Sequence, residues 1–517
     1  MPVRPRHPLP SPKALAQRAR RLPRAAGAAL LFAASALAHA ADAPSLLLPD
    51  DAGLRDDLEW LVDRGVLSLP LGTWPLPSML LEAALGQRPR TLPDAADADA
   101  LARVRRALDH SRDPAHAALR LNSARHPALD DRGIARGSAD ARIGVRAAGA
   151  ADWSLRLELG STAEALARGA SQPTLAGSYA MLRLSDAVFA LGQVDRWWGP
   201  GRYASPILSN AAPPQPALLV RRAIDTAPDA PALRWIGRWG YELSFGELLE
   251  FHPAHTKLLG MRLYARPWPN VELGVSRSMQ WAGAGRPASW PALRDALLGH
   301  SNIDDPAQRG MDPSNELAGF DARVAGALGN AASWAGYAHL VGEDEAGGLP
   351  SAWIGTLGAA LKYAAGGQRW AWRLESSDTV MSRLWLLNPR SERHPEPRPA
   401  YTHHIYADGY YAQGLPLGAA IGGGGRIATA GLALAPIGDP LLRRYSLALW
   451  SGRVSQTGAQ AIDAAFGTPG RLDGFALAVQ GETARALRWN LGLSVQRYSA
   501  GVRPTAGVQA GIDVPLR

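Results

Sequence analysis

The sequence of 517 residues contains no cysteine. Without thiols the chain cannot build a disulfide scaffold, use a cysteine nucleophile or hold a metal through thiolates. It also lacks an uninterrupted apolar run of the about 20 residues that a membrane-spanning helix needs. The GxSxG, HExxH and Walker sequences do not occur either. These absences exclude a helical membrane protein and leave no motif that supports a named enzyme.

The surplus of basic residues is concentrated in the first 24 positions. The chain carries 55 Lys and Arg against 46 Asp and Glu, a formal net charge of +9. Seven of the basic residues precede Ala25, and without them 48 basic residues face 46 acidic ones. The remaining charge is nearly balanced, so we predict no nucleic-acid partner.

The N-terminus has the three parts of a secretory signal peptide. The basic stretch is followed by an apolar run over residues 25–37 and by the small-x-small sequence Ala38-His39-Ala40. The apolar run is too short to span a membrane. We therefore predict a cleaved signal peptide over residues 1–40. An exported protein without transmembrane helices is periplasmic, secreted or an outer-membrane barrel.

Residues 41–115 show helical periodicity. In residues 53–64 the apolar side chains recur at spacings of three and four, which is typical of an amphipathic helix. Pro77 opens a second short helical pattern, and Asp94 precedes a third. Three short helices predict a small bundle that needs a larger body to dock on.

From residue 116 to the C-terminus the hydrophobic period is two. The clearest example is residues 239–246, in which Trp, Tyr, Leu and Phe alternate with Gly, Glu and Ser. The same alternation recurs in a hairpin over 142–159, in another over 259–276 and at the end of the chain over 508–516. The pattern predicts many strands, each with one apolar and one polar face.

Stacked soluble sandwiches and one large membrane barrel both contain many such strands. The chain has 17 Trp and 12 Tyr against 7 Phe, and amphipathic rings gather at the two interfaces of a membrane barrel. At roughly 22 residues for a strand and its turn, about 400 residues supply about 18 strands. A closed barrel leaves no exposed edge. We therefore predict a mostly β protein, with a large antiparallel transmembrane β-barrel over residues 116–517 and a small N-terminal α-helical bundle.

One acidic cluster could carry chemistry. It comprises Glu343, Asp344 and Glu345. Paired carboxylates hydrolyse glycosides, and carboxylate oxygens bind Ca²⁺. Neighbouring residues in a strand point to opposite faces, however, and the following Gly347-Gly348 pair indicates a turn. We favour a charged strand end and loop over a cation site, and a cation site over catalysis.

Two histidine pairs and a glycine run complete the candidates for ligand binding. His252 with His255, and His403 with His404, lack a third ligand at a recognisable spacing. We interpret them as solvated loop or lumen histidines and predict no metal and no cofactor. The glycine run over residues 422–425 lacks the strand-loop-helix setting of a phosphate site, which indicates a flexible loop.

The segment over residues 192–209 differs from its surroundings because paired tryptophans lie next to arginines. Tryptophan rings stack on sugar rings, and guanidinium groups pair with the carboxylates of acidic sugars. A tryptophan pair at an interface, followed by a structural turn, is the alternative. Our hypothesis is that five residues contact a polysaccharide or form the structure that presents the contact: Arg196, Trp197, Trp198, Arg202 and Tyr203.

Longer strings in this chain carry a family resemblance. VDRWWGPG (194–201), SPILSNAAPPQPAL (205–218), YAHLVGEDEAGGLPS (337–351) and HHIYADGYYAQGLPLG (403–418), together with LRDDLEWLVDRGVL (54–67), resemble the Wzi-type capsule assembly family of Gram-negative outer-membrane proteins. The resemblance spans nearly the whole mature chain. It implies a barrel of about 18 strands in the outer membrane with the helical bundle at its periplasmic end.

The resemblance also implies a function, which periodicity does not. The protein would be a non-catalytic lectin that attaches capsular polysaccharide to the cell surface. Its partners would be that polysaccharide, the outer-membrane lipids and, during biogenesis, the barrel assembly machinery. Two other classes remain open. A diffusion porin would share the barrel but would not require the bundle, and a polysaccharide hydrolase in the barrel would rely on Glu343 and Glu345.

Overall fold

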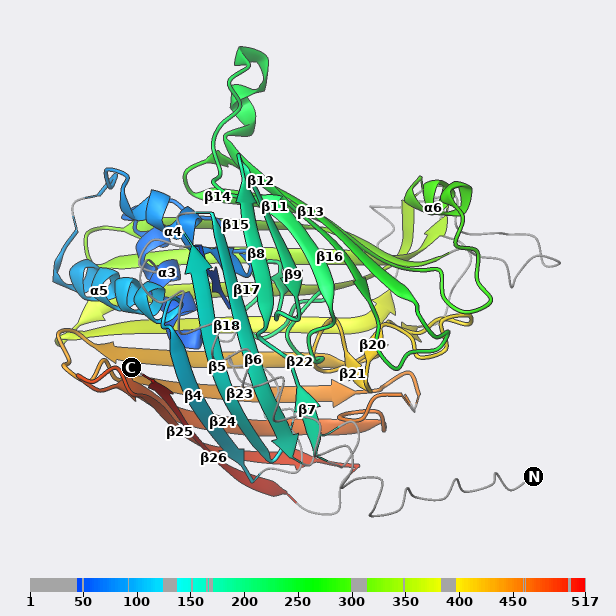
Figure 1. Cartoon of the computed structure of the whole chain (residues 1–517). Helices are drawn as coiled ribbons and strands as arrows, with labels where there is room; N and C mark the ends of the chain where they lie inside the picture. The colour runs from blue at the N-terminus through cyan, green and yellow to red at the C-terminus, as the bar shows by residue number, and fades with distance from the viewer. Residues whose placement is uncertain are drawn as a thin grey trace.

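The computed structural model describes residues 44–48, 51–91, 93–123, 137–149, 152–163, 166, 171–298, 314–346, 349–382, 397–458, 460, 462–500 and 504–516, without the side chains of 344–346 and 349–351. The predicted signal peptide lies outside the described residues. The described part forms one β-barrel with its three N-terminal helices gathered at one end (Figure 1).

The three helices predicted near the N-terminus are present: α3 (Ala52–Asp63), α4 (Ser78–Leu85) and α5 (Ala95–His110). The Asp51 side chain caps α3 by accepting from the Leu54 amide at 2.9 Å. Asp94 and Asp97 form a capping box at the start of α5. None of the helices among the described residues is long and apolar enough to cross a membrane.

The barrel wall begins at residue 115 and is made of long antiparallel strands. In chain order they are β4 (Ala115–Asn122), β5 (Ala139–Gly149), β6 (Trp153–Ala163), β8 (Tyr179–Leu184), β9 (Ala187–Gly192), β11 (Ala217–Arg222), β12 (Arg238–Glu247), β13 (Lys257–Trp268), β14 (Val271–Trp281), β15 (Ser314–Leu328), β16 (Ala332–Ala346), β17 (Leu349–Ala365), β18 (Gln368–Ser382), β22 (Arg426–Pro436), β23 (Arg444–Val454), β24 (Gly470–Glu482), β25 (Arg488–Tyr498) and β26 (Thr505–Pro515).

The sheet closes between its first and last strands. β26 pairs with β4, for example Ile512 with Leu119, and every other wall strand pairs with the next one along the chain. Two short strands, β7 (Gln172–Thr174) and β19 (Arg398–Pro399), pair at the rim beside β6 and β18. The closed barrel of 18 antiparallel strands confirms the predicted fold class.

The two faces of the wall have opposite polarity. On β12, Leu243 faces outward and is 45% exposed, whereas the next residue towards the N-terminus, Glu242, faces inward and is fully buried. The same contrast holds on β18, where Leu374 is 66% exposed and Arg373 is buried. A polar interior and an exposed apolar outer face are typical of a barrel that spans a lipid bilayer. We call the exposed outer face the lipid-facing belt.

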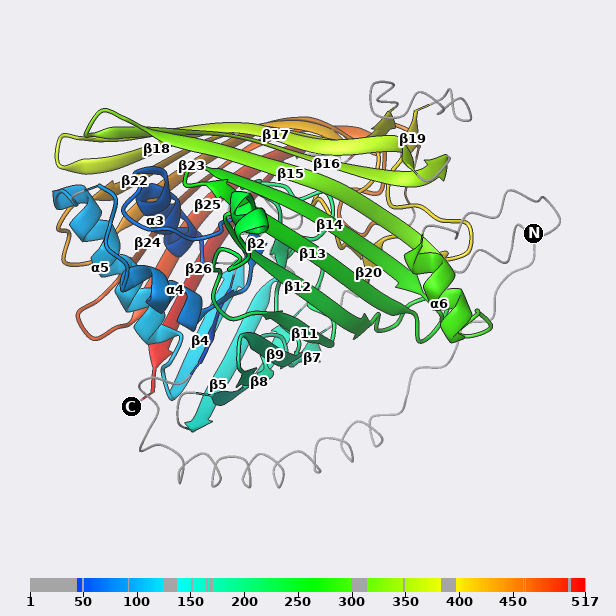
Figure 2. The same cartoon turned by 90° about the horizontal axis from the view of Figure 1, so that it is seen from above.

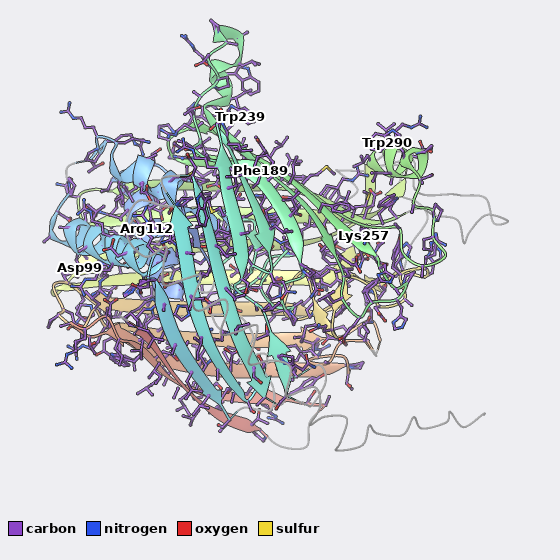
Figure 3. All side chains as sticks on the ribbon, in the orientation of Figure 1. Asp99, Arg112, Phe189, Trp239, Lys257 and Trp290 are labelled. Atoms are coloured by element: carbon purple, nitrogen blue, oxygen red, sulfur yellow. The ribbon has the colours of Figure 1, made fainter. Side chains whose placement is uncertain are left out.

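The two ends of the barrel differ in their connections. Short turns such as 185–186, 269–270, 329–331 and 366–367 lie at the end that carries the bundle. We call this the short-turn end; one longer connection, which contains η2 (Pro231–Ile236), also leaves from it. The longer segments between strands, one of which carries α6 (Trp290–Leu297), lie at the other end, the long-loop end. Figure 3 labels Asp99 at the short-turn end and Trp290 at the long-loop end.

The bundle covers the opening of the barrel at the short-turn end, with α3 facing the interior and α5 lying across the rim (Figure 2). Its core contains the apolar faces of α3, α4 and α5, including Leu58, Leu61, Leu81 and Val104. A short strand pair, β1 (Leu46–Leu47) with β3 (Leu76–Pro77), links its segments. The predicted need for docking is therefore met by the barrel itself.

Candidate functional site

The helix α3 is held in the barrel by buried ion pairs. Its acidic face presents Asp56, Asp57, Glu59 and Asp63 to basic residues of the wall. The contacts are Asp56 with Arg373 at 2.6 Å and with Arg444, Asp57 with Arg369 at 2.6 Å, Glu59 with Arg373 at 2.9 Å and Lys362 at 3.1 Å, and Asp63 with Arg323 and Lys362 at 2.5 Å each. The bundle is thus fixed by charge as well as by apolar packing.

Burial and these charges act in opposite directions on the acids of α3. Although burial opposes ionisation, the charges of Arg373 and Lys362 hold the pKa of Glu59 well below its ordinary value. Burial raises the pKa of Asp57 because Arg369 offsets it only in part. Glu59 is therefore anionic at neutral pH and needs its cations to stay buried.

The segment over residues 193–216 folds into the barrel from the long-loop end. It contains the strand β10 (Trp197–Trp198), which pairs antiparallel with β2 (Thr73–Trp74) of the bundle region. The Arg55 guanidinium of α3 lies 4.8 Å from the centroid of the Trp197 ring and donates to the Gly201 carbonyl at 3.0 Å. The predicted combination of tryptophan and arginine therefore exists, but its partner is the bundle.

Trp198 fills a space that the wall leaves open for it. Its ring is fully buried, and its Nε1 donates to Glu242 Oε1 at 2.9 Å. A Cβ at Gly260 on β13 would lie 2.7 Å from the Trp198 ring, so glycine is required for this close approach. The packing ties the inserted segment to the interior of β12 and β13.

Glu375 on β18 anchors the next part of the same segment. Its carboxylate accepts from the backbone amides of Arg202 at 2.6 Å, Tyr203 at 3.0 Å and Ala204 at 2.7 Å, and from the Tyr337 hydroxyl at 2.8 Å. The Arg202 side chain donates to the Ala52 carbonyl at 2.8 Å. One inward carboxylate thus fixes three successive backbone amides.

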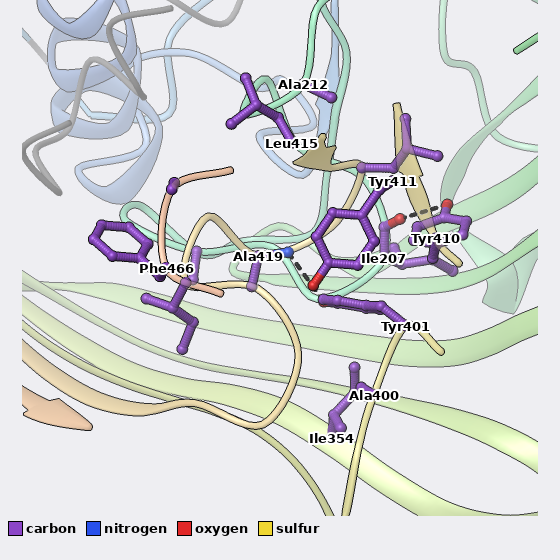
Figure 4. Close-up of a cluster of buried hydrophobic side chains, with 14 of the residues drawn as sticks. Ile207, Ala212, Ile354, Ala400, Tyr401, Tyr410, Tyr411, Leu415, Ala419 and Phe466 are labelled. Atoms are coloured by element: carbon purple, nitrogen blue, oxygen red, sulfur yellow. Dashed lines mark hydrogen bonds between the residues drawn. The ribbon is translucent and has the colours of Figure 1, made fainter. Parts of the chain in front are cut away.

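A second segment, residues 397–425, packs beside the first. It carries β20 (Tyr411–Ala412) and β21 (Leu415–Pro416), and its tyrosines are buried with Phe466 and Ile207 in one apolar cluster (Figure 4). The Tyr401 hydroxyl donates to the Pro206 carbonyl at 2.6 Å and accepts from the Ala419 amide, and the Tyr410 hydroxyl donates to the Ile207 carbonyl at 2.8 Å. Burial raises the pKa of both hydroxyl groups, which therefore stay neutral donors.

The structure brings the five predicted contact residues together, but inside the protein. Trp197, Trp198, Arg196 and Arg202 are buried, and Tyr203 is half-buried. Burial lowers the pKa of the Arg196 guanidinium. A sugar ring cannot stack on these tryptophans in this arrangement. Their contacts give these residues a structural position inside the barrel.

The acidic cluster lies near the end of β16 at the long-loop end. Glu343 points into the barrel, is 4% exposed and accepts from the Tyr401 amide at 3.1 Å. The side chains of Asp344 and Glu345 lie outside the described residues. In the described part of the chain no group of three or more His, Asp or Glu side chains is arranged to hold a metal ion. Because Glu343 has this structural contact, we favour a charged strand end and loop over a cation site or catalysis.

The histidines lie at the long-loop end. His252 and His255, between β12 and β13, have side chains 80% and 77% exposed. The Asp408 carboxylate accepts from the His252 amide at 2.8 Å, so two loops are joined there. His403 and His404 stack with ring centroids 4.7 Å apart. Their position agrees with solvated loop histidines.

The prediction of a flexible loop at residues 422–425 is wrong. All four glycines are buried. The Gly423 amide donates to the Tyr411 hydroxyl at 3.0 Å, and the Gly425 amide donates to Thr379 Oγ1 at 2.8 Å. Glycine is needed here because Gly422 and Gly424 adopt positive φ and the chain passes closely under the tyrosine cluster.

The interior is not completely filled. A cavity of about 1190 Å³ lies between the bundle, the inserted segments and the wall from β4 to β6 and β24 to β26. Its charged lining is paired, for example Arg142 with Asp140 at 2.6 Å and Arg156 with Glu158 at 2.6 Å. The lining combines apolar surface with charged side chains of both signs in nearly equal number.

Trp198 offers a direct test of the structural role. Trp198→Ala should destabilise the protein by about 3–5 kcal/mol, because it removes a fully buried ring and leaves Glu242 without that donor. Thermal unfolding of the purified barrel in detergent measures the loss. Trp290→Ala is the matched control, since Trp290 is 71% exposed and its removal should change stability by less than about 0.5 kcal/mol. Equal effects of the two variants would contradict the assignment.

We expect the docking of α5 to depend on pH through His110. It lies 3.0 Å from Asp113 and 3.0 Å from Glu482 of β24. Although burial opposes protonation, these contacts raise its pKa to about 9 from an ordinary value of 6.5. The stabilisation is therefore complete below about pH 6.5 and is lost as the pH rises through about 9. Protease cleavage of the bundle should increase over this range in the wild type, and His110→Gln should remove most of that change.

Sequence reasoning missed Glu375 and the acidic face of α3. The signal for α3 was present, since Asp56, Glu59 and Asp63 recur at spacings of three and four on one side of the helix. Glu375 gives no local signal, because its partners lie far away in the sequence.

Comparison with known proteins supports one family throughout the chain. The family model for the capsule assembly protein Wzi matches residues 125–435. A 55.8 kDa protein in the cps region of Klebsiella pneumoniae is 32% identical over 496 residues, which cover 94% of this chain and 92% of the relative.

A solved structure agrees with this match. Wzi of Escherichia coli, described as an outer-membrane protein involved in group 1 capsule assembly and a carbohydrate-binding β-barrel, has a TM-score of 0.77 at 30% identity. The similarity covers 91% of this chain and 99% of that one. The fold, the inserted segments and the matched residues lead to one conclusion: the chain belongs to the Wzi capsule assembly family.

Proposed function

We propose that this protein binds capsular polysaccharide and attaches it to the cell surface without catalysing a reaction on it. The observation that carries the proposal is the end-to-end similarity to Wzi of Escherichia coli, which is described as carbohydrate-binding and involved in capsule assembly. The similarity includes the barrel and the N-terminal region, so it concerns the whole architecture and not one motif.

The orientation follows from the general build of outer-membrane barrels. Their short turns face the periplasm and their longer loops face outward. The bundle at the short-turn end would then be periplasmic, and the long-loop end would face the capsule. Residues 1–40 would direct export and be removed. Outer-membrane lipids would surround the belt, and the barrel assembly machinery would insert the strands.

Polysaccharide would meet the loops of the long-loop end that the inserted segments support. The loops at 248–256 and 401–408 are joined by the His252–Asp408 contact at 3.1 Å. They expose His252, His255 and His404, whose ring nitrogens can bond sugar hydroxyls. The buried tryptophans and tyrosines beneath would hold these loops in place, which reduces the ordering cost of binding.

The chemistry of the interior gives less support to the two other functions. Of the two carboxylates that a hydrolase would use, Glu343 is buried and accepts from the Tyr401 amide, so it is not positioned against a substrate, and the side chain of Glu345 lies outside the described residues. Paired catalytic carboxylates need access to the scissile bond. A diffusion porin needs an open lumen, and α3 lies across it with ion pairs to the wall.

The test separates attachment from synthesis. Deleting the gene should move capsular polysaccharide from the cell pellet to the medium while the total stays constant. Complementation with the double variant His252→Ala, His404→Ala should restore only part of the retention at unchanged barrel abundance, because both side chains are exposed. An unchanged partition after deletion would contradict attachment, and a fall in total polymer would indicate a role in synthesis or export.

A further inference from the structure

The connection between β11 and β12 forms an arm that projects from the barrel. It comprises residues 223–237 and contains η2, none of whose residues is buried. Trp235 is 72% exposed and Leu233 is 45% exposed. Figure 1 shows the arm rising sideways from the wall near the short-turn end, and in Figure 2 it points towards the viewer. Both views place it beside the barrel and not over the opening.

The base of the arm is held in position. Asp225 is buried and pairs with Arg238 at 3.1 Å and with Arg266 at 3.0 Å. The Arg222 guanidinium lies 4.5 Å from the centroid of the Trp239 ring and donates to the Thr226 carbonyl at 3.1 Å. Figure 3 labels Trp239 at this base. These contacts determine the direction in which the exposed tip points.

The arm begins where the lipid-facing belt ends. On β12 the outward residues Tyr241, Leu243 and Phe245 belong to the belt, and Trp239 is the last of this series before the arm. On the neighbouring strand Trp268 is 61% exposed at the same border. The base of the arm therefore lies at the border of the surface that faces lipid.

Exposed aromatic residues of the wall lie at the same height along the barrel axis as the base of the arm. Among the described strand residues, all exposed Trp and Tyr side chains lie near the short-turn end: Trp153, Trp268, Trp334, Trp372 and Tyr445. Amphipathic rings of this kind lie at the border between lipid chains and headgroups. The arm leaves the wall at that border.

We propose that the arm is an interfacial anchor that inserts Leu233 and Trp235 into the headgroup region of the phospholipid surface at the short-turn end. Arg234, between them, is exposed and can reach lipid phosphates while its aliphatic stem stays at the apolar boundary. The anchor sets the depth and rotation of the barrel in the bilayer. The inference takes the orientation proposed above but does not depend on carbohydrate binding.

The absence of cysteine makes a site-specific test possible. Ala232→Cys, which keeps Trp235, is labelled with a fluorophore in nanodiscs of phosphatidylethanolamine and phosphatidylglycerol. Leu243→Cys in the belt is the lipid-exposed reference, and Ala102→Cys on the exposed side of α5 is the water-exposed reference. Retained folding of each variant is checked by heat-modifiable mobility in gels.

The expected result is that brominated lipid quenches the probe at position 232 to within about twofold of position 243, and that aqueous iodide quenches it about threefold less than at position 102. Adding Trp235→Ala should increase quenching of the probe by iodide and decrease its quenching by brominated lipid. Iodide access equal to that at Ala102 would overturn the proposal. Protection from both quenchers would also overturn it, since a protein and not lipid would then cover the arm.

Discussion

Replacing Asp63 by Ala should release the helical bundle from the barrel. The Asp63 carboxylate is buried and is paired with Arg323 and Lys362 at 2.5 Å each. Removing this carboxylate takes away the partner of Arg323 and leaves Lys362 paired with Glu59 alone. Breaking a buried ion pair costs about 3–5 kcal/mol. Because the ion pairs of α3 join the bundle to the wall, the substitution should mainly weaken the docking of the bundle and leave the barrel itself folded. Limited proteolysis of the bundle, compared with the heat-modifiable mobility of the barrel, measures it.

Two further variants define the cause. Asp109→Ala on α5 removes an exposed carboxylate and should leave proteolysis unchanged. Combining Asp63→Ala with Arg323→Met and Lys362→Met removes the buried charges as well, and should return part of the lost protection. If the bundle of Asp63→Ala were as resistant to proteolysis as that of the wild type, the ionic docking of α3 would be refuted.

Replacing Glu375 by Ala should free the first inserted segment. The variant leaves the amides of Arg202, Tyr203 and Ala204 without their acceptor, at a cost of about 1–3 kcal/mol for each buried donor. Hydrogen exchange followed by mass spectrometry should then show faster exchange in peptides that cover residues 199–208. If these residues support the capsule-facing loops, cell-bound polysaccharide should fall as well.

Asp378→Ala is the matched control for this experiment. Asp378 lies on the same strand, but its carboxylate is 39% exposed and pairs with the exposed Arg426. Such a pair contributes at most about 1 kcal/mol, so exchange over residues 199–208 should stay at the wild-type rate. Accelerated exchange in both variants would mean that β18 as a whole had loosened, which would contradict a specific role for Glu375.

The wall of the barrel could be predicted because its signal is local. Leu243 and Phe245 alternate with Glu242 and Ser244, and the structure has β12 there with the apolar side chains outward. The helices were predictable for the same reason, since the caps and apolar spacings of α3 and α5 lie within a few residues of each other.

The interior could not be predicted from the same patterns. Nothing local distinguishes a loop that covers the barrel from one that folds into it, and Trp198 is buried only because Gly260 and Glu242, far along the chain, make room and bond to it. The composition of residues 192–209 indicated that the segment was special. Its burial depends on contacts with α3 and β18 that are distant in the sequence.

The pairing of β26 with β4 has a consequence for how the molecule is made. The first and last wall strands are separated by nearly the whole barrel sequence, so the ring can be sealed only after all intervening hairpins have formed. The bundle is joined to β4 by residues 111–114 alone. The bundle is therefore tethered next to β4. Its ion pairs reach wall strands from β15 to β23, and β23 comes close to β4 only when β26 pairs with β4. We therefore expect the pairing of β26 with β4 and the docking of the bundle to form together.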